Sequence, residues 1–356
     1  MYEHGVGKCH VELSTRCNAA CPQCPRNYAD GRIAELLPIT ELDLCFFKSN
    51  IPDVLLQTIK SWNFCGNYGD PAAAVECLEI LEFVRTCSAT TQLVMHSNGS
   101  LRSESWWRSL AATGVHVYFG IDGMEDTHSR YRRNTSWEKV IRNARAFIEA
   151  GGEATWQFIP FKHNEHQVDG CRDLAKQLGF KGFAVRRSNR FQSPAGEALS
   201  GVLVPSKDHR NGYLLEPPSR EAHKTPLMKS DSAPQYRAML NTACVRCKAA
   251  MGAEFYLAAT GHVFPCCYLG HIYFKGATSC YSRELPRLIR EHGLDLDALS
   301  LREHDFFEVI EGPVFSEIIP GTWAPGAGNA LLTCRRICGV ESLAYEPEVF
   351  SQRIEF

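Results

Sequence analysis

The sequence has little net charge and no long apolar run. Its 356 residues carry 38 lysines and arginines against 40 aspartates and glutamates, a formal net charge of −2. This balance gives no indication of a nucleic-acid or membrane-surface partner, although it does not rule out a nucleic acid. No apolar stretch approaches the roughly 18 residues of a membrane helix, and the N-terminus lacks the basic and apolar segments of a secretory signal. We therefore expect a cytoplasmic protein without a membrane partner.

Cysteine, by contrast, is abundant, with 16 residues in the chain. A disulfide scaffold is not expected, because cytosolic thiols are kept reduced. Most of the cysteines gather in an opening motif and in the segment after residue 240, which is typical of metal ligands. The scattered remainder are expected to be small buried hydrophobic side chains: Cys9, Cys45, Cys65, Cys77, Cys87 and Cys171.

The opening motif places Cys17, Cys21 and Cys24 at C-x3-C-x2-C spacing, directly after a strand predicted over residues 8–13. An iron-sulfur cluster normally takes four thiolates, so three leave one iron open. The motif resembles the signature of the radical S-adenosylmethionine (radical SAM) superfamily. The resemblance implies that these cysteines are catalytic and hold a [4Fe-4S] cluster whose open iron binds S-adenosyl-L-methionine. The alternative is a structural zinc knuckle.

Strands and helices alternate along the first half of the chain. Six βα-like units favour a parallel sheet curved towards a barrel that stays open on one side. The resemblance implies an α/β fold, a partial (β/α)6 barrel of the radical SAM type followed by a C-terminal cysteine-rich domain. Strands are predicted over 8–13, 61–65, 92–96, 115–121, 155–161 and 181–187. Helices are predicted over 42–60 (interrupted near 50–52), 71–84, 103–114, 137–150 (with Thr135 and Glu138 as a capping box) and 169–178.

Three segments follow from these patterns: a barrel over 1–192, a linker or long loop over 193–240, and an auxiliary cluster domain over 241–356. In the last, residues 254–258 and 262–265 flank Thr260-Gly261 and predict a β-hairpin. Helices are expected near 283–291 and 296–310.

Three turns at strand ends resemble the cofactor contacts of the superfamily. Residues 66–70 are similar to its Gly-Gly-Glu turn, 97–99 to its Thr-Asn-Gly turn, and 120–132 to the S-I-D-G…H-x-x-Y-R element of peptide-modifying relatives. The resemblance implies cofactor-binding roles for Gly66, Gly69, Asp70, Asn98, Asp122 and Arg132. A helix N-cap is the alternative role for Asp70.

Two positions depart from these patterns. Gly120 stands where relatives carry serine, so one expected hydroxyl contact is missing. Gln23 replaces the aromatic or aliphatic residue that usually packs on the adenine.

The later cysteines resemble the SPASM and twitch extensions of the superfamily. The start of that pattern is present here: thirteen residues separate Cys247 from Gly261, and four separate Gly261 from Cys266. With Cys334 and Cys338, the resemblance implies one auxiliary [4Fe-4S] cluster, and the missing second half of a full SPASM run favours a twitch-like module. A second cluster involving the spare Cys244, Cys267 and Cys280 stays open. A zinc ribbon is the alternative.

The expected activity is that of a radical SAM enzyme, in which a 5'-deoxyadenosyl radical abstracts hydrogen from a peptide or amino-acid-like substrate. Oxidation, crosslinking or epimerisation would follow. Only seven residues precede the first strand, so a peptide-recognition domain is absent from the sequence, which counts against a peptide. The alternatives are a nucleotide, sugar or hypermodified DNA base as substrate, or a zinc-stabilised binding protein. A flavodoxin or ferredoxin is the expected reductant.

Overall fold

The computed structural model describes residues 5–191, 198–206, 212–224, 238, 240–273, 280–327, 330–339 and 351–356. The chain divides into two compact units. The first comprises Met1–Arg16, Ala34–Val94 and Pro234–Leu343, and the second comprises Cys17–Ile33, Met95–Ala233 and Ala344–Phe356. In the described part of the chain, no helix is both long and apolar enough to cross a membrane.

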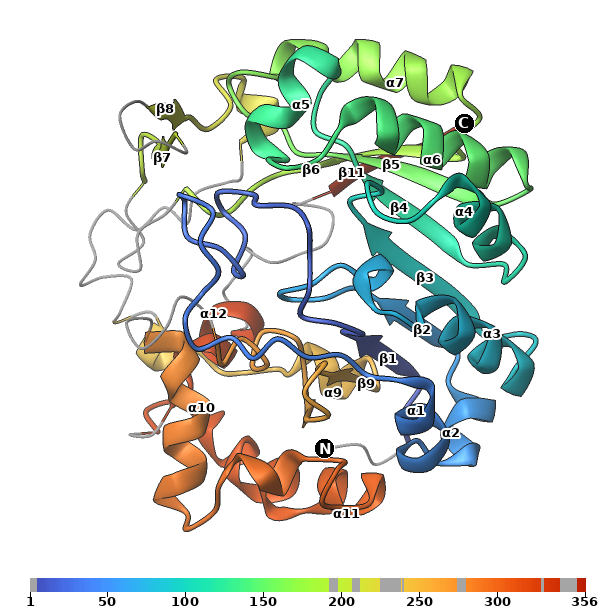
Figure 1. Cartoon of the computed structure of the whole chain (residues 1–356). Coiled ribbons are helices and arrows are strands. Elements are labelled where there is room, and N and C mark those ends of the chain that lie inside the picture. The colour runs from blue at the N-terminus through green and yellow to red at the C-terminus, as the bar shows by residue number, and fades with distance from the viewer. Residues whose placement is uncertain are drawn as a thin grey trace. The chain divides into compact units, whose positions relative to one another are not determined.

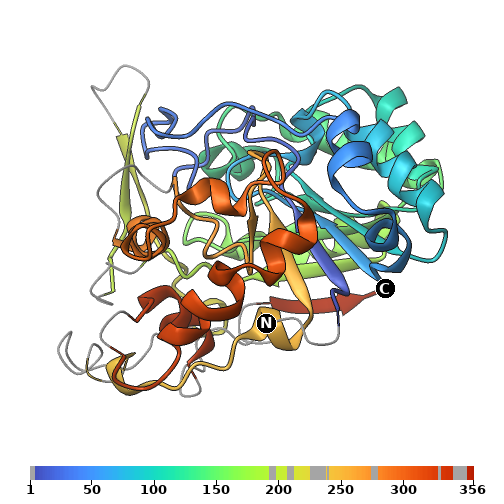
Figure 2. The same cartoon turned by 90° about the horizontal axis from the view of Figure 1, so that it is seen from below.

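The sheet of the first unit is mostly parallel. Strand β1 (Lys8–Val11) pairs in parallel with β2 (Ser61–Phe64) on one side and with β9 (Glu254–Leu257) on the other. Strand β10 (Val263–Phe264) completes the predicted hairpin with β9. A strand from the cysteine-rich segment thus lies directly beside the first strand of the chain, which Figures 1 and 2 both show.

Helices of the first unit bury apolar faces such as that of α3, where Ile80, Leu81 and Val84 are fully buried. The interruption predicted near 50–52 is confirmed, because Pro52 separates two helices and has no N–H to continue the first. The helix predicted over 71–84 is wrong in its first turn, because Ala74 is extended and separates η1 from α3. The helical segments are α1 (Leu44–Asn50), α2 (Asp53–Thr58), η1 (Pro71–Ala73), α3 (Cys77–Cys87), α9 (Lys248–Met251), α10 (Cys280–Glu291), η5 (Leu296–Leu299), α11 (Phe306–Glu311), η6 (Val314–Ile318), η7 (Pro320–Thr322) and α12 (Leu332–Cys338).

The second unit has its own parallel strands, β4 (His116–Gly120), β5 (Glu153–Phe158) and β6 (Gly182–Arg186), with β11 (Ser351–Glu355) antiparallel to β6. Strand β3 (Gln92–Ser97) begins in the first unit and ends in the second. The helices are α4 (Glu104–Ala111), α5 (Glu125–Tyr131), α6 (Trp137–Glu149), η2 (Glu165–Gln167), α7 (Val168–Gln177) and η3 (Glu221–His223).

Alternation along β4 and β5 divides the second unit's sheet into an apolar and a polar face. Phe119 packs under α4 and α6, with its ring centroid 5.0 Å from that of Trp107 and 6.0 Å from that of Phe147. Each of these aromatic side chains is fully buried. Removing one would cost about 3–5 kcal/mol. This layer fixes the carboxyl ends of the strands, from which the site is built.

Two details of the second unit differ from the sequence-based predictions. Ser136, and not Thr135, is the N-cap of α6, because the Thr135 hydroxyl donates to the Arg132 carbonyl 2.6 Å away. The linker predicted over 193–240 contains a hairpin of β7 (Val202–Pro205) and β8 (Gly212–Leu215), whose strands run side by side in Figure 2. Val204 and Leu215 anchor this hairpin in an apolar cluster.

Candidate functional site

The cysteine motif lies in a loop of the second unit. Cys21 is buried, and Cys17 and Cys24 pack half-buried against the same apolar cluster, which also contains Tyr131 and Phe161. The Cys24 N–H donates to the Cys21 carbonyl at 3.0 Å, which closes a tight turn between the two cysteines. All three predicted thiols therefore pack against one apolar cluster.

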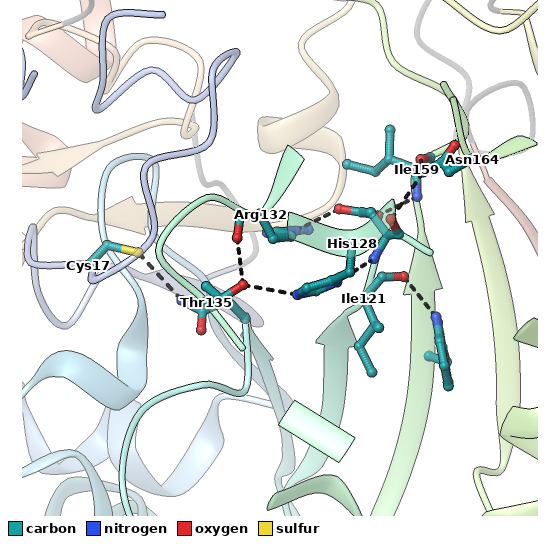
Figure 3. Close-up of polar contacts among 10 residues, drawn as sticks. Cys17, Ile121, His128, Arg132, Thr135, Ile159 and Asn164 are labelled. Atoms are coloured by element: carbon teal, nitrogen blue, oxygen red, sulfur yellow. Dashed lines mark hydrogen bonds and ion pairs between the residues drawn. The ribbon is translucent and has the colours of Figure 1, made fainter. Parts of the chain in front are cut away.

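A nitrogen donor and a cation act on two of the three sulfurs. Asn98 Nδ2 lies 3.5 Å from Cys17 Sγ (the dashed line from Cys17 in Figure 3), and the charge of the Arg132 guanidinium acts on the Cys21 sulfur. Burial raises the pKa of Cys21 to about 11, and the guanidinium opposes this effect. A sulfur that accepts hydrogen bonds from N–H groups suits an iron-sulfur ligand, whose charge such bonds stabilise.

Arg132 is held by the carboxylate of Asp122, which is fully buried. Arg132 Nε lies 2.6 Å from Asp122 Oδ2, and Asp122 Oδ1 accepts the Ile159 N–H at 2.6 Å. The Asp122 carbonyl accepts from Asn164 Nδ2 at 3.2 Å. Burial raises the pKa of Asp122, and Arg132 counteracts the rise. The structure therefore brings together two predicted site residues, Asp122 and Arg132, beside Cys21.

His128 completes this network, although the sequence analysis assigned it no role of its own. Its Nδ1 accepts the Asp122 backbone N–H at 3.2 Å, so Nε2 carries the proton and donates to Thr135 Oγ1 at 3.0 Å. Burial, aided by the charge of Arg132, lowers the pKa of His128 to about 3. The ring is fully buried and neutral, and Figure 3 shows it joined to Thr135.

The turn after β3 requires a glycine and orients Asn98. Gly99 has φ +72°, and a Cβ there would lie 2.7 Å from the Phe119 ring. Asn98 Oδ1 accepts the Ser100 N–H at 2.9 Å, while Nδ2 reaches Asn18 Oδ1 at 3.1 Å as well as Cys17. The side chain predicted to bind cofactor thus also braces the cysteine loop.

Gln23 connects the cysteine loop to the segment after β6. Its Nε2 donates to the Arg190 carbonyl at 3.2 Å, and Arg190 Nη1 donates to the Gln23 carbonyl at 2.8 Å. Ser188 Oγ donates to Gln23 Oε1 at 3.3 Å. The residue that stands in place of an adenine-packing side chain therefore uses its amide to tether the loop.

Gly66, Gly69 and Asp70 belong to the first unit, where the buried carboxylate of Glu12 organises their turn. Glu12 Oε1 accepts the N–H groups of Tyr68 at 2.6 Å and Gly69 at 3.1 Å, and Oε2 accepts the Tyr256 hydroxyl at 2.8 Å. Burial raises the pKa of Glu12. Glu12 carries a sequence signal that the predictions above did not use, a carboxylate between the apolar Val11 and Leu13, both of which are buried.

The glycines of this turn have little room. A Cβ on Gly69 would lie 1.6 Å from the Ser14 carbonyl oxygen, and one on Gly66 would lie 2.7 Å from the Gly69 carbonyl oxygen. Asp70 Oδ1 accepts the Ala72 N–H at 3.0 Å, so the alternative N-cap role is present.

The four predicted auxiliary ligands are neighbours in the first unit. The interaction with Cys247 lowers the pKa of Cys338, and Cys266 interacts electrostatically with Cys247 and Cys334. Of the spare cysteines, Cys244 is exposed, and the side chain of Cys280 lies outside the described residues. Among the side chains that the structure describes, no group of three or more His, Cys, Asp or Glu is arranged to hold a metal ion.

Comparison with protein families identifies the class. Residues 11–174 match the family model of the Radical SAM superfamily, and this part of the chain is a radical SAM domain. The chain is therefore a radical SAM enzyme, and its superfamily implies a [4Fe-4S] cluster and S-adenosylmethionine. The expected fold class, mixed α/β with a mostly parallel sheet, is confirmed. No curated protein sequence matches the chain.

Solved structures give the particular resemblances. Streptococcus suis SuiB bound to precursor peptide SuiA is 13% identical, with a TM-score of 0.54, covering 93% of this chain and 71% of SuiB. Histidine-tagged anSMEcpe with bound AdoMet is 17% identical, with a TM-score of 0.54, and the match covers 88% of this chain and 79% of anSMEcpe. Native anSMEcpe with AdoMet and the Kp18Cys peptide is 15% identical, with a TM-score of 0.51, covering 95% and 92%. At these identities the likeness concerns the fold.

Proposed function

We propose that Cys17, Cys21 and Cys24 hold the [4Fe-4S] cluster and that residues of the three turns at the strand ends bind S-adenosylmethionine. The observation that carries this proposal is that three thiols pack against one cluster of side chains, where Cys17 faces the Asn98 amide and the charge of Arg132 acts on Cys21. When bound, the cluster and cofactor supply a 5'-deoxyadenosyl radical that removes a hydrogen atom from substrate. The protein positions these groups and excludes water.

The residues of the turns at the strand ends have different proposed roles in cofactor binding. Gly66 and Gly69 form a close-packed turn whose backbone Glu12 fixes in place. Asp70 and Asn98 supply polar side chains, and Asp122 fixes the direction of Arg132. The assignment of cofactor contacts to Gly66, Gly69, Asp70, Asn98, Asp122 and Arg132 is part of the same proposal.

The proposed substrate is a peptide or amino-acid-like molecule, which would be oxidised, crosslinked or epimerised. The SuiB structure holds a precursor peptide and the native anSMEcpe structure holds the Kp18Cys peptide, which supports this choice. The polar face of the second unit's sheet adds support through hydrogen-bonding pairs of side chains. His96 Nδ1 lies 3.3 Å from Gln157 Oε1, and His116 Nε2 lies 2.8 Å from Thr155 Oγ1. Such groups suit amides better than an apolar chain.

We further propose that Cys247, Cys266, Cys334 and Cys338 hold an auxiliary [4Fe-4S] cluster in a twitch-like module over residues 241–356. Their mutual interactions support it. The module would follow a radical SAM barrel over 1–192 and a connecting segment over 193–240. A flavodoxin or ferredoxin would supply the electron.

Anaerobic purification tests both cluster proposals. We expect brown protein with about eight irons and matching sulfide, as two [4Fe-4S] clusters require. With dithionite replacing the reductant protein, S-adenosylmethionine should yield 5'-deoxyadenosine. Cys21→Ala should abolish the product, and Cys334→Ala should lose iron yet retain some cofactor cleavage. Cys45→Ala, which changes an exposed thiol on α1, is the matched control. Colourless protein with stoichiometric zinc, or full activity of Cys21→Ala, would refute the proposal.

A further inference from the structure

The carboxyl end of β4 has an unusual packing feature. Gly120 is buried, and a Cβ built on it would lie 2.5 Å from Arg132 Nη2 and 3.3 Å from Nη1. A serine at this position would therefore displace the guanidinium. The absence of a side chain at position 120 therefore leaves the space that the Arg132 guanidinium occupies.

The guanidinium has a fixed orientation in this space. Nε points at Asp122 Oδ2, while the terminal nitrogens lie beside Gly120. The Ala20 N–H donates to the Arg133 carbonyl at 2.9 Å, which holds the cysteine loop beside Arg132. The charge of the guanidinium therefore acts on the sulfur of Cys21, which is buried. Because this sulfur is shielded from water, the charge is weakly screened and acts on it strongly.

We infer that Arg132 sets the reduction potential of the cluster held by Cys17, Cys21 and Cys24, and that Gly120 makes room for it to do so. The inference rests on the proposed cluster ligands. Reduction would add negative charge to the cluster and its sulfur ligands, and a cation close to a ligand sulfur stabilises the reduced form. Arg132 therefore makes the cluster easier to reduce, and Asp122 limits the effect by neutralising part of its charge.

This role predicts that substitutions of Arg132 and Asp122 shift the reduction potential in opposite directions. Arg132→Gln removes the cation and should lower the reduction potential. Asp122→Asn leaves the cation uncompensated and should raise it. A tenfold change in the ratio of reduced to oxidised cluster corresponds to about 59 mV for a one-electron couple, and we expect at least this shift for Arg132→Gln.

The experiment is potentiometry of the anaerobic holoenzyme, monitored by electron paramagnetic resonance without S-adenosylmethionine. Cys334→Ala is used as the common background, so that the signal reports the cluster of the opening motif. Gly120→Ala should lower the potential as Arg132→Gln does, because its Cβ displaces the guanidinium. Arg132→Lys should restore at least half of the shift. Arg130→Gln, the same substitution at an exposed position of α5, should leave the potential unchanged.

Iron and sulfide content, with a thermal melt, establish first that each variant is folded and loaded. Unloaded wild-type protein would overturn the proposed cluster itself. With loaded protein, an unchanged potential in Arg132→Gln would overturn the inference. Shifts of the same sign in Arg132→Gln and Asp122→Asn would also overturn it, as would a shift that arises only after S-adenosylmethionine is added, since Arg132 would then act as a cofactor contact.

Discussion

Lowering the pH should destabilise the network around Asp122 through one buried imidazole. Burial lowers the pKa of His128 from its ordinary value of 6.5 to about 3. Between these values the unfolded chain binds a proton that the folded chain does not. Stability is therefore present above the unfolded pKa and is lost as the pH falls from 6.5 towards 3.

The size of the effect follows from the two pKa values. Each pKa unit corresponds to about 1.36 kcal/mol, so the contribution lost between pH 7.5 and pH 5 is about 2 kcal/mol. Protonation at Nδ1 would also remove the acceptor for the Asp122 N–H and place a cation near Arg132. His128→Asn removes the titrating group, so it should remove about 2 kcal/mol of the pH dependence, whatever it costs at pH 7.5.

Urea unfolding followed by tryptophan fluorescence, under anaerobic conditions and at equal iron content, measures this difference. Wild type and His128→Asn are compared at pH 7.5 and pH 5. His304→Asn replaces an exposed histidine and should retain the wild-type pH dependence. If His128→Asn loses as much stability as wild type between the two pH values, the buried neutral imidazole is not what links stability to pH.

Two further predictions concern the turn in the first unit. Because burial raises the pKa of Glu12 above its ordinary value of 4.5, the folded state keeps a proton that the unfolded chain loses. The stabilising contribution of Glu12 therefore decreases as the pH rises from 4.5 through the folded-state pKa. Glu12→Gln removes one acceptor oxygen and should lower the free energy of unfolding by about 1–3 kcal/mol at pH 5. In urea titrations, the difference in stability between wild type and this variant should be smaller at pH 8. A difference that stays constant between the two pH values would contradict this prediction. Gly69→Ala should exceed the usual overpacking penalty of about 1–3 kcal/mol, because its Cβ meets backbone 1.6 Å away, while Gly321→Ala, in open space, should melt like wild type; equal melting of both would disprove the clash.

The parallel strands could be predicted because each is a short apolar run that ends in a turn. Helix α5 could not, since its seven residues include Thr127 and His128 on the buried side and carry no apolar period. Strand β11 is polar and pairs with β6, which is remote in sequence. The hairpin of β7 and β8 buries only Val204 and Leu215, too few apolar positions to stand out in a polar segment.

The site was predictable where a motif is local and not where it depends on packing. The spacing of Cys17, Cys21 and Cys24 is visible in sequence, and so is the proximity of Asp122 to Arg132. The direction of the Arg132 side chain is not, because it depends on Asp122 being fixed by Ile159 at the end of another strand. Sequence alone presented Gly120 as a lost contact, whereas the structure presents it as space for a guanidinium.

Asp122 unites these observations, because it contacts the network through all of its polar groups. Its side chain holds Arg132 and the Ile159 N–H, its backbone N–H donates to His128, and its carbonyl accepts from Asn164. The Thr135 hydroxyl accepts from His128 and donates to the Arg132 carbonyl, which completes a ring of hydrogen bonds. Such a ring of buried hydrogen bonds has one favourable arrangement, since any rotated member leaves an unpaired polar group. The rigidity of the turn after β4 therefore holds the guanidinium at the Cys21 sulfur.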